Sequence, residues 1–189
     1  LIVMTGYHSM RSPHETLLKS STDIIIKSNH VDFMLLRLCK KLDHNSNLEK
    51  LELDGLTVKF NNEIKDYGSF RLIENIEDSE IIDRDLVRWK NYAFENGNFL
   101  RTPGTYATSV IRDCLFGKCV FCRYNGPELS FSSMSIKKSV DEYENLINKY
   151  KVKEIFDDSG VWYRGKDAIE FAKEIIRRDL HKAGCYFGI

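Results

Sequence analysis

The front part of the chain alternates short apolar runs with stretches in which apolar residues recur at helical spacing. Residues 1–4 and 23–27 are short, apolar and rich in β-branched side chains, which favours strands. Ser12 with Glu15 matches the capping box of a short helix between them, and residues 30–42 predict a longer helix after the second strand. This alternation of strands and helices indicates a piece of a doubly wound α/β domain.

A hairpin and a polar stretch follow. In residues 56–67, two runs of strand character flank Asn61 and Asn62, which tolerate the positive φ of a tight turn, so we expect a hairpin there. The next stretch is polar, partly acidic and only weakly periodic, which is typical of a connection between domains. We therefore expect a first domain in residues 1–66, an interdomain linker in residues 67–101 and a second domain in residues 102–189.

The second domain repeats a strand–helix unit. Residues 106–112 and 152–156 predict strands; a helix with a capping box at Ser139 and Glu142 follows the first, and a helix over residues 166–180 follows the second. The positions that we expect this later helix to bury are Ile169, Ala172, Ile175 and Ile176. A last short strand is expected after the later helix. A βα barrel begins with such an alternation of strands and helices. In these barrels the functional loops follow the carboxyl ends of the strands.

Composition and charge narrow the class of protein. Among 189 residues, 28 are Lys or Arg and 28 are Asp or Glu, so no basic field argues for a nucleic-acid partner. No apolar run approaches the roughly 20 residues that span a bilayer, and no signal-peptide pattern is visible. We expect a cytoplasmic protein with neither a nucleic-acid nor a membrane partner. Both ends lie inside apparent strands, so we also expect the chain to be a segment (a fragment) of a longer protein.

The most informative stretch is "IRDCLFGKCVFCRYN", residues 111–125. It places Cys114, Cys119 and Cys122, three of the five cysteines, within nine positions. Thiols stay reduced in the cytoplasm, where clustered cysteines more often bind a metal than form disulfides. The stretch follows a predicted strand at the end where barrel enzymes carry their chemistry.

The residues alone leave four interpretations of this cluster open. A disulfide would use two thiols and leave the third over. A structural zinc needs four ligands, so His181 or Cys185 would have to join the three. An iron–sulfur cluster held by three thiolates leaves one iron without a protein ligand, and Gly117 would let the backbone pass close to such a cluster. Three buried free thiols are the fourth interpretation, and they would be vulnerable to oxidation.

With Phe121 directly before the third cysteine, the stretch resembles the radical S-adenosylmethionine superfamily. The signature of that superfamily is three cysteines on the loop after the first barrel strand, with an aromatic residue just before the last. Four residues separate Cys114 from Cys119, where the common form has three, so "CLFGKCVFC" looks like a four-residue-spacer variant.

The rest of the chain is similar to members that carry a cobalamin-binding domain ahead of the barrel. "EIFDDSGVWYRGKDAIEFAKEIIRRDL" resembles their second strand, acidic loop and helix, and "VMTGYHSMRSPHETLLKSSTDIIIKSNHVDFMLLRL" follows the element order at the end of their first domain. There are departures: Thr5 stands where a Gly is usual, "KSNHVDF" replaces a Gly- and Glu-rich segment, and the Asp-x-His-x-x-Gly motif that supplies the lower ligand of cobalt is not in this sequence.

The resemblance implies both a fold and an activity. The fold is the C-terminal part of a Rossmann-like, cobalamin-binding-type domain, followed by the first βα units of a partial TIM-like barrel. The activity is that of a radical S-adenosylmethionine enzyme, in which a 4Fe-4S cluster reductively cleaves S-adenosylmethionine to methionine and a 5′-deoxyadenosyl radical. The radical takes hydrogen from a small-molecule substrate, and the electron comes from a donor such as flavodoxin or ferredoxin. The reaction itself stays open, with cobalamin-dependent methyl transfer as one option.

The same resemblance implies the site residues. Cys114, Cys119 and Cys122 would hold the cluster, and Phe121 would lie beside the adenine of S-adenosylmethionine. Asp157 and Asp158 would meet the ammonium group of S-adenosylmethionine, although Asp-Asp-Ser-Gly also favours a simple turn. Gly6 would line the cobalamin tail, although a Gly after a strand is more often only a turn. No residue is assigned as catalytic.

Two other classes of function compete with this enzyme. In one the cysteines hold a structural zinc in a non-catalytic module, and in the other an iron–sulfur cluster only carries electrons. The two remaining cysteines, Cys39 and Cys185, fall at apolar positions of predicted elements, so we expect them in the core.

Overall fold

The chain forms two compact units, each built from separate stretches of sequence. A computed structural model describes residues 1–28, 30–44, 47–70, 76–94, 99–107, 111–112, 114–122 and 131–188. The first unit comprises Leu1–Ile73 with Phe116–Ser130, and the second comprises Glu74–Leu115 with Phe131–Ile189. The domain boundaries expected from the sequence stay a prediction.

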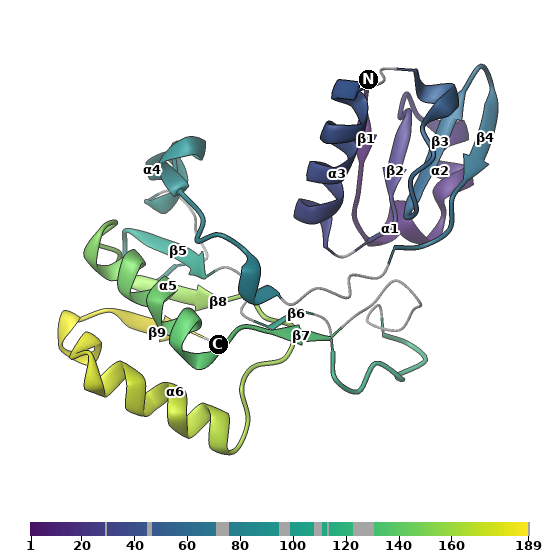
Figure 1. Cartoon of the computed structure of the whole chain (residues 1–189). Helices are drawn as coiled ribbons and strands as arrows, with labels where there is room; N and C mark the ends of the chain where they lie inside the picture. The colour runs from purple at the N-terminus through teal and green to yellow at the C-terminus, as the bar shows by residue number, and fades with distance from the viewer. Residues whose placement is uncertain are drawn as a thin grey trace. The chain divides into compact units, whose positions relative to one another are not determined.

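The first unit is a mixed sheet with helices along it (Figure 1). Its strands are β1 (Val3–Met4), β2 (Ile24–Ile26), β3 (Leu56–Phe60) and β4 (Glu63–Asp66), in that spatial order. β1 and β2 are parallel, whereas the other two pairs are antiparallel. The expected hairpin is confirmed, because β3 and β4 meet at Asn61 and Asn62, with φ of 49° and 66°. Asparagine tolerates this left-handed region better than most residues.

Helices lie against both faces of this sheet. Short helices α1 (Tyr7–Arg11) and α2 (Pro13–Lys19) connect β1 to β2, and α3 (Val31–His44) and the 3₁₀ turn η1 (Leu48–Lys50) connect β2 to β3. Ile24 and Ile26 pack in one core with Met34 and Leu38 of α3. Ile25 points to the opposite face and is also fully buried, as expected of a strand covered on both sides.

The second unit contains a parallel sheet of three strands. These are β5 (Gly104–Ala107), β8 (Glu154–Asp157) and β9 (Tyr186–Gly188), which lie side by side in chain order. A separate two-stranded antiparallel ribbon joins β6 (Ile111–Arg112) to β7 (Ser132–Ser133). The strand expected over residues 106–112 is therefore represented by the end of β5 and by β6, and residues 108–110 between them lie outside the described part.

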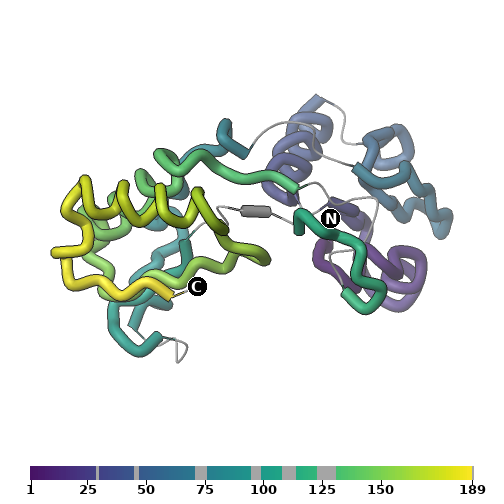
Figure 2. Tube along the Cα trace, turned by 90° about the horizontal axis from the view of Figure 1, so that it is seen from below, coloured from purple at the N-terminus to yellow at the C-terminus, as the bar shows by residue number. Residues whose placement is uncertain are grey.

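Two long helices cover one face of the parallel sheet. α5 (Ile136–Asn148) connects β5 to β8, and α6 (Lys166–Arg177) with the 3₁₀ turn η4 (Leu180–Ala183) connects β8 to β9. Figures 1 and 2 show both helices on the same side of the strands. The Tyr143 ring of α5 packs edge-on against Phe171 of α6 at 5.2 Å and against Phe187 of β9 at 5.3 Å. These aromatic contacts lie within the main core of the second unit.

Part of the expected linker packs into this core. The segment forms the short turns η2 (Ile76–Asp78) and η3 (Arg84–Val87) and the helix α4 (Lys90–Ala93). Ile76, Trp89 and Ala93 are buried with the side chains of α5 and α6. The Trp89 ring packs edge-on against Tyr150 at 5.2 Å. Residues 76–93 thus stabilise the second unit rather than only connecting two domains.

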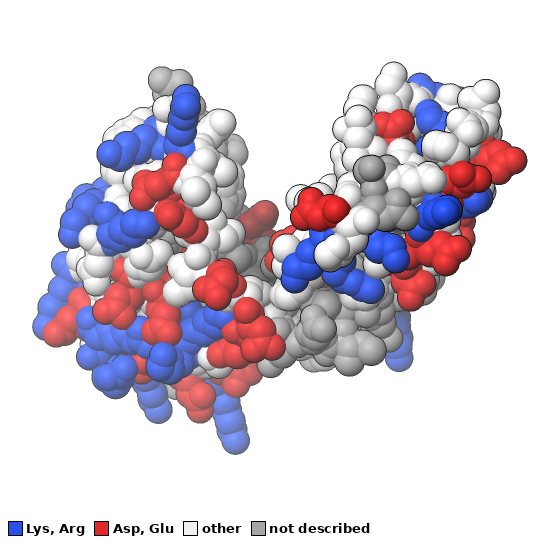
Figure 3. Space-filling view, turned by 45° about the horizontal axis from the view of Figure 1, so that its top comes forward, with Lys and Arg blue, Asp and Glu red and all other residues white. Residues whose placement is uncertain are grey.

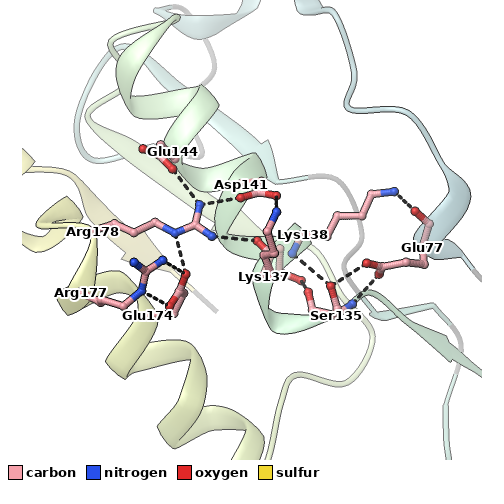
Figure 4. Close-up of polar contacts among 10 residues, drawn as sticks. Glu77, Ser135, Lys137, Lys138, Asp141, Glu144, Glu174, Arg177 and Arg178 are labelled. Carbon is pink, nitrogen blue, oxygen red and sulfur yellow. Dashed lines mark hydrogen bonds and ion pairs between the residues drawn. The ribbon is translucent and has the colours of Figure 1, made fainter.

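The start of α5 differs from the expectation. Its N-cap is Ser135, whose side chain accepts a hydrogen bond from the Lys138 N–H at 3.2 Å. Ser139 is buried within the helix and donates its hydroxyl to the Ser135 carbonyl, so the expected cap at Ser139 is wrong. The Glu77 carboxylate accepts the Ser135 N–H at 2.7 Å and the Ser135 hydroxyl at 2.6 Å (Figure 4). A distant acidic residue thereby satisfies the helix start, where a negative charge is favourable.

The buried face of α6 also differs from the expectation. Phe171 and Ile175 are buried, whereas Ile169 and Ile176 are 55% and 59% exposed and Ala172 is exposed. The prediction was therefore right for Ile175 and wrong for the other three. Both faces of the helix carry apolar side chains, so spacing alone did not identify the one that contacts the sheet.

An ion network joins α5 to the end of α6 (Figure 4). The Arg178 guanidinium donates to Asp141 at 2.6 Å, to Glu144 at 2.7 Å and to Glu174 at 2.7 Å. Glu174 also accepts two hydrogen bonds from Arg177. Through these contacts one cation bridges carboxylates of both helices, which favours their packing.

The molecule is thus a mixed α/β protein with parallel strand pairing, as the sequence predicts in its coarse form. On the face drawn in Figure 3, acidic and basic side chains are interspersed, in keeping with a formal net charge of zero. Within the described residues, no helix is both long enough and apolar enough to cross a bilayer.

Candidate metal centre

A tight turn joins two of the three clustered cysteines. The Cys122 N–H donates to the Cys119 carbonyl at 3.0 Å, and Val120 and Phe121 occupy the corner between them. Such a turn brings its first and fourth residues within about 7 Å of each other at the Cα atoms. The sequence Cys-Val-Phe-Cys therefore folds so that two thiols start from neighbouring points of the backbone, as a shared metal centre requires.

The third cysteine precedes this turn in the same stretch. Cys114 follows β6 by two positions, and Gly117 between Cys114 and the turn has a φ of 54°, which glycine adopts without strain. Cys114 belongs to the second unit, whereas Cys119 and Cys122 fall within the stretch that groups with the first. No disulfide bond forms among the described residues, and Cys39 is exposed, so its expected place in the core is wrong.

No ligand set is assembled among the described residues. In that part of the chain, no group of three or more His, Cys, Asp or Glu side chains is placed to hold a metal ion. The predicted cluster ligands therefore stay a prediction, supported at Cys119 and Cys122 by the turn. His181 and Cys185, the further ligands that zinc would need, lie in η4 and just before β9.

The cysteine stretch carries apolar side chains that face solvent. Leu115 and Phe116 are 75% and 63% exposed, and Val120 and Phe121 are 93% and 90% exposed. Single exposed apolar residues are ordinary, but a concentration of them marks a surface that something else covers. An exposed Phe121 ring is accessible to a ligand, and its place beside an adenine stays a prediction.

The two adjacent aspartates after β8 have different surroundings. Asp157 is 3% exposed, on the side of β8 that faces the helices, whereas Asp158 is exposed. The Asp157 carboxylate accepts hydrogen bonds from the Tyr143 hydroxyl at 3.3 Å, from Trp162 Nε1 at 3.2 Å and from the Ser159 N–H at 3.0 Å. Burial raises the pKa of Asp157 above its ordinary value, although these hydrogen bonds oppose the shift.

The sequence did not reveal the polar partners of Asp157. The sequence pattern assigns no polar role to Tyr143 or Trp162. One signal was available, because buried tyrosine and tryptophan side chains usually find a hydrogen-bond partner for their polar atoms. Burial of the Tyr143 hydroxyl raises its pKa, and the negative charge of the neighbouring Asp157 raises it further.

A second buried pair was also missed. The Arg84 guanidinium donates to Glu142 at 2.6 Å and to the Tyr106 carbonyl at 2.9 Å, and the side chains of Arg84 and Glu142 are only 7% and 3% exposed. This pair joins the segment before β5 to α5, so we interpret it as structural. No sequence pattern links two charges that are 58 positions apart.

The residue predicted to line the cobalamin tail, Gly6, gives no sign of a binding cradle. Gly6 has a φ of 109°, and open space surrounds the position where a Cβ atom would be added. Its backbone conformation alone therefore accounts for glycine here. The neighbouring His8 is exposed in α1. The described residues therefore do not show a fit to cobalamin. The prediction that the chain binds cobalamin rests on the sequence resemblance alone.

Comparison with known proteins identified no relative. No model of a protein family matches the chain, and searches of curated proteins and of solved structures found no significant match.

Proposed function

We propose that this chain is part of a radical S-adenosylmethionine enzyme whose cysteine stretch binds a 4Fe-4S cluster. The observation that carries the proposal is the Cys119–Cys122 turn, which presents two thiols from neighbouring backbone points, with a third thiol five positions earlier. Thiolates are the ligands of iron–sulfur clusters, so the chemistry of the donor set fits. The exposed apolar residues of this stretch support the proposal, because a bound cluster and its ligand would cover apolar surface.

The fold of the second unit supports a barrel. The three parallel strands follow one another in chain order, and both connecting helices lie on one face of the sheet. This singly wound pattern is the repeating unit of a βα barrel, in which ligands bind beyond the carboxyl ends of the strands. In the first unit, the parallel β1–β2 pair with its connecting helices is compatible with part of a Rossmann-like domain.

Each part of the stretch has a separate task in this proposal. Cys114, Cys119 and Cys122 would hold the cluster, and ligation by only three thiolates would leave it able to bind S-adenosylmethionine. Phe121 offers an exposed ring on which adenine can stack. When bound, the cluster supplies one electron that cleaves a carbon–sulfur bond of S-adenosylmethionine, giving methionine and a 5′-deoxyadenosyl radical. The protein binds and orients the reactants and excludes water.

The proposed partners are a reduced flavodoxin- or ferredoxin-type donor and a small-molecule substrate of unassigned class. A non-catalytic zinc module remains the second candidate, because a Cys-x-x-Cys turn also suits one half of a tetrahedral zinc site. Zinc would need ligands besides the three clustered cysteines. The two candidates therefore differ in the metal, in the presence of sulfide and in the response to S-adenosylmethionine.

The proposal is tested by anaerobic reconstitution of the chain, followed by iron, zinc and sulfide analysis. We expect about four irons and four sulfides per chain, and an EPR signal of the reduced protein that changes when S-adenosylmethionine is added. Replacing Cys114, Cys119 or Cys122 by serine should each lower bound iron to less than about half. The matched controls Cys39→Ser and Cys185→Ser should keep it.

Three outcomes would contradict this proposal. One zinc per chain without sulfide would favour the structural module. A cluster whose EPR signal ignores S-adenosylmethionine would favour a simple electron carrier. Iron loss in Cys39→Ser or Cys185→Ser as large as in the three proposed ligand variants would show that the cysteine stretch is not the binding site.

A further inference from the structure

The adjacent aspartates Asp157 and Asp158 differ in a way that separates their roles. The three donors to Asp157 come from two directions: Tyr143 belongs to α5, while Ser159 and Trp162 belong to the loop between β8 and α6. Both carboxylate oxygens are engaged, because Ser159 donates to Oδ1 and the two aromatic side chains donate to Oδ2. A ligand could reach this carboxylate only by displacing these donors and opening the core.

The surrounding core holds this arrangement firmly. Trp162 packs edge-on against Phe171 at 5.3 Å, and Phe171 in turn packs against Tyr143 at 5.2 Å. The hydroxyl of Tyr163, next to Trp162, donates to the Met134 carbonyl at 2.8 Å. The loop is therefore fixed on both sides of the exposed Asp158: by Asp157 before it and by the two aromatic residues after it.

We propose that Asp157 is a positioning residue, whose buried carboxylate fixes the β8–α6 loop so that Asp158 alone of the pair faces a ligand. The identity of the ligand rests on the proposed function: the ligand is S-adenosylmethionine, and Asp158 faces its ammonium group. It narrows the implication of the resemblance, in which both aspartates meet that group. Asp157 acts through Ser159 and Trp162, and it does not touch the ligand.

One test uses Trp162 as a spectroscopic reporter. The chain has two tryptophans, so Trp89→Phe leaves Trp162 alone. Because its indole N–H donates to Asp157, we expect the emission of Trp162 to change as Asp157 titrates, at a pH above the ordinary value of 3.8. Asp157→Asn should abolish this change, and Asp158→Asn should keep it. Persistence of the change in Asp157→Asn would overturn the inference.

The other ionisable groups around this site must be separated from Asp157. The groups that act on its neighbours are Tyr143, Tyr163, Cys185, Asp167 and Glu77. Burial raises the pKa of both tyrosines and raises that of Cys185 to about 11, so none of these three titrates in acid. The two carboxylates act on Tyr163. Asp167→Asn and Glu77→Gln, each in the Trp89→Phe background, are therefore the controls, and both should retain the acid transition.

A second test separates positioning from direct binding, using the reconstituted full chain. In Asp157→Ala, hydrogen exchange of the Ser159 amide should become about tenfold faster or more, because that amide loses its side-chain acceptor. In Asp158→Asn, the amide should keep its protection while the affinity for S-adenosylmethionine falls about tenfold or more. The opposite pattern would overturn the inference. That pattern is a loss of affinity in Asp157→Ala with unchanged exchange at Ser159, together with wild-type affinity in Asp158→Asn.

Failure of the proposed function would be distinguishable. If the reconstituted wild-type chain bound no S-adenosylmethionine, the ligand assigned to Asp158 would fall together with the proposed function. The emission of Trp162 and the exchange of the Ser159 amide need no cofactor, so they would still decide whether Asp157 fixes the loop.

Discussion

Replacing Arg84 by alanine should destabilise the second unit by about 3–5 kcal/mol, because the Glu142 carboxylate would stay buried without its counter-charge. The atoms that pair are 2.6 Å apart, and the two side chains are 7% and 3% exposed. An exposed ion pair is worth only about 0–1 kcal/mol, so burial is what sets the larger range. Arg84 also donates to the Tyr106 carbonyl, whose hydrogen bond would be lost as well.

The assay is urea unfolding followed by tryptophan emission. Both tryptophans, Trp89 and Trp162, belong to the second unit, so their emission reports the unfolding of that unit. With a urea dependence of about 1.5 kcal/mol per molar, a loss of 3–5 kcal/mol corresponds to a midpoint lower by about 2–3 M. If the unit is already unfolded without urea, stabilising osmolyte added equally to both proteins restores a measurable transition.

Two controls make this prediction refutable. Arg177→Ala removes a guanidinium that is 68% exposed and should leave the midpoint nearly unchanged. The double change Arg84→Met with Glu142→Leu removes both charges, and it should recover much of the lost stability because no buried charge is left over. A shift in Arg84→Ala no larger than that in Arg177→Ala would refute the reasoning.

Three further predictions concern other contacts. Arg178→Ala should lower the free energy of unfolding by about 1–2 kcal/mol, and by less at high salt, in the same urea assay. The variant loses two charged hydrogen bonds to Asp141 and Glu144 of α5 and one to Glu174 of α6. Hydrogen bonds from neighbouring arginines lower the pKa of Glu174 from 4.5 to about 2. The stabilisation of the fold by the Glu174 carboxylate is therefore present above pH 4.5 and lost as the pH falls toward 2. The difference in free energy of unfolding between wild type and Glu174→Gln should shrink over that range. Gly55→Ala should destabilise the first unit by more than about 2 kcal/mol, because φ is +87° and the new Cβ would clash with the Phe70 Cβ. The Lys27 N–H donates to the Gly55 carbonyl, so faster hydrogen exchange of the Lys27 amide would report this destabilisation.

Local signals in the sequence predicted much of the fold. The positive-φ turn at Asn61 and Asn62 and the helix that begins at Pro13 each depend on a few adjacent residues. The start of α5 could not be predicted in this way, because Glu77 satisfies the Ser135 cap from 58 positions away. Likewise, only the packed sheet decides which apolar face of α6 is buried.

The candidate site shows the same division. The three-cysteine pattern is local and visible in the sequence. The Cys119–Cys122 turn is not predicted, because Val120 and Phe121 at its corner are not typical turn residues. The distinction between Asp157 and Asp158 depends on which side of β8 faces the helices, and on a tyrosine hydroxyl supplied by α5. Two identical neighbouring residues therefore looked equivalent until the strand was placed in its sheet.

The buried Arg84–Glu142 pair has a consequence for the order in which the second unit assembles. A guanidinium that leaves water before its carboxylate is in place would face the full desolvation cost, so the pair should close late, after α5 has formed on the sheet. Its interactions would then be largely absent from the folding transition state. Removing Arg84 should accordingly accelerate unfolding much more than it slows refolding, which makes this pair a determinant of the lifetime of the folded unit.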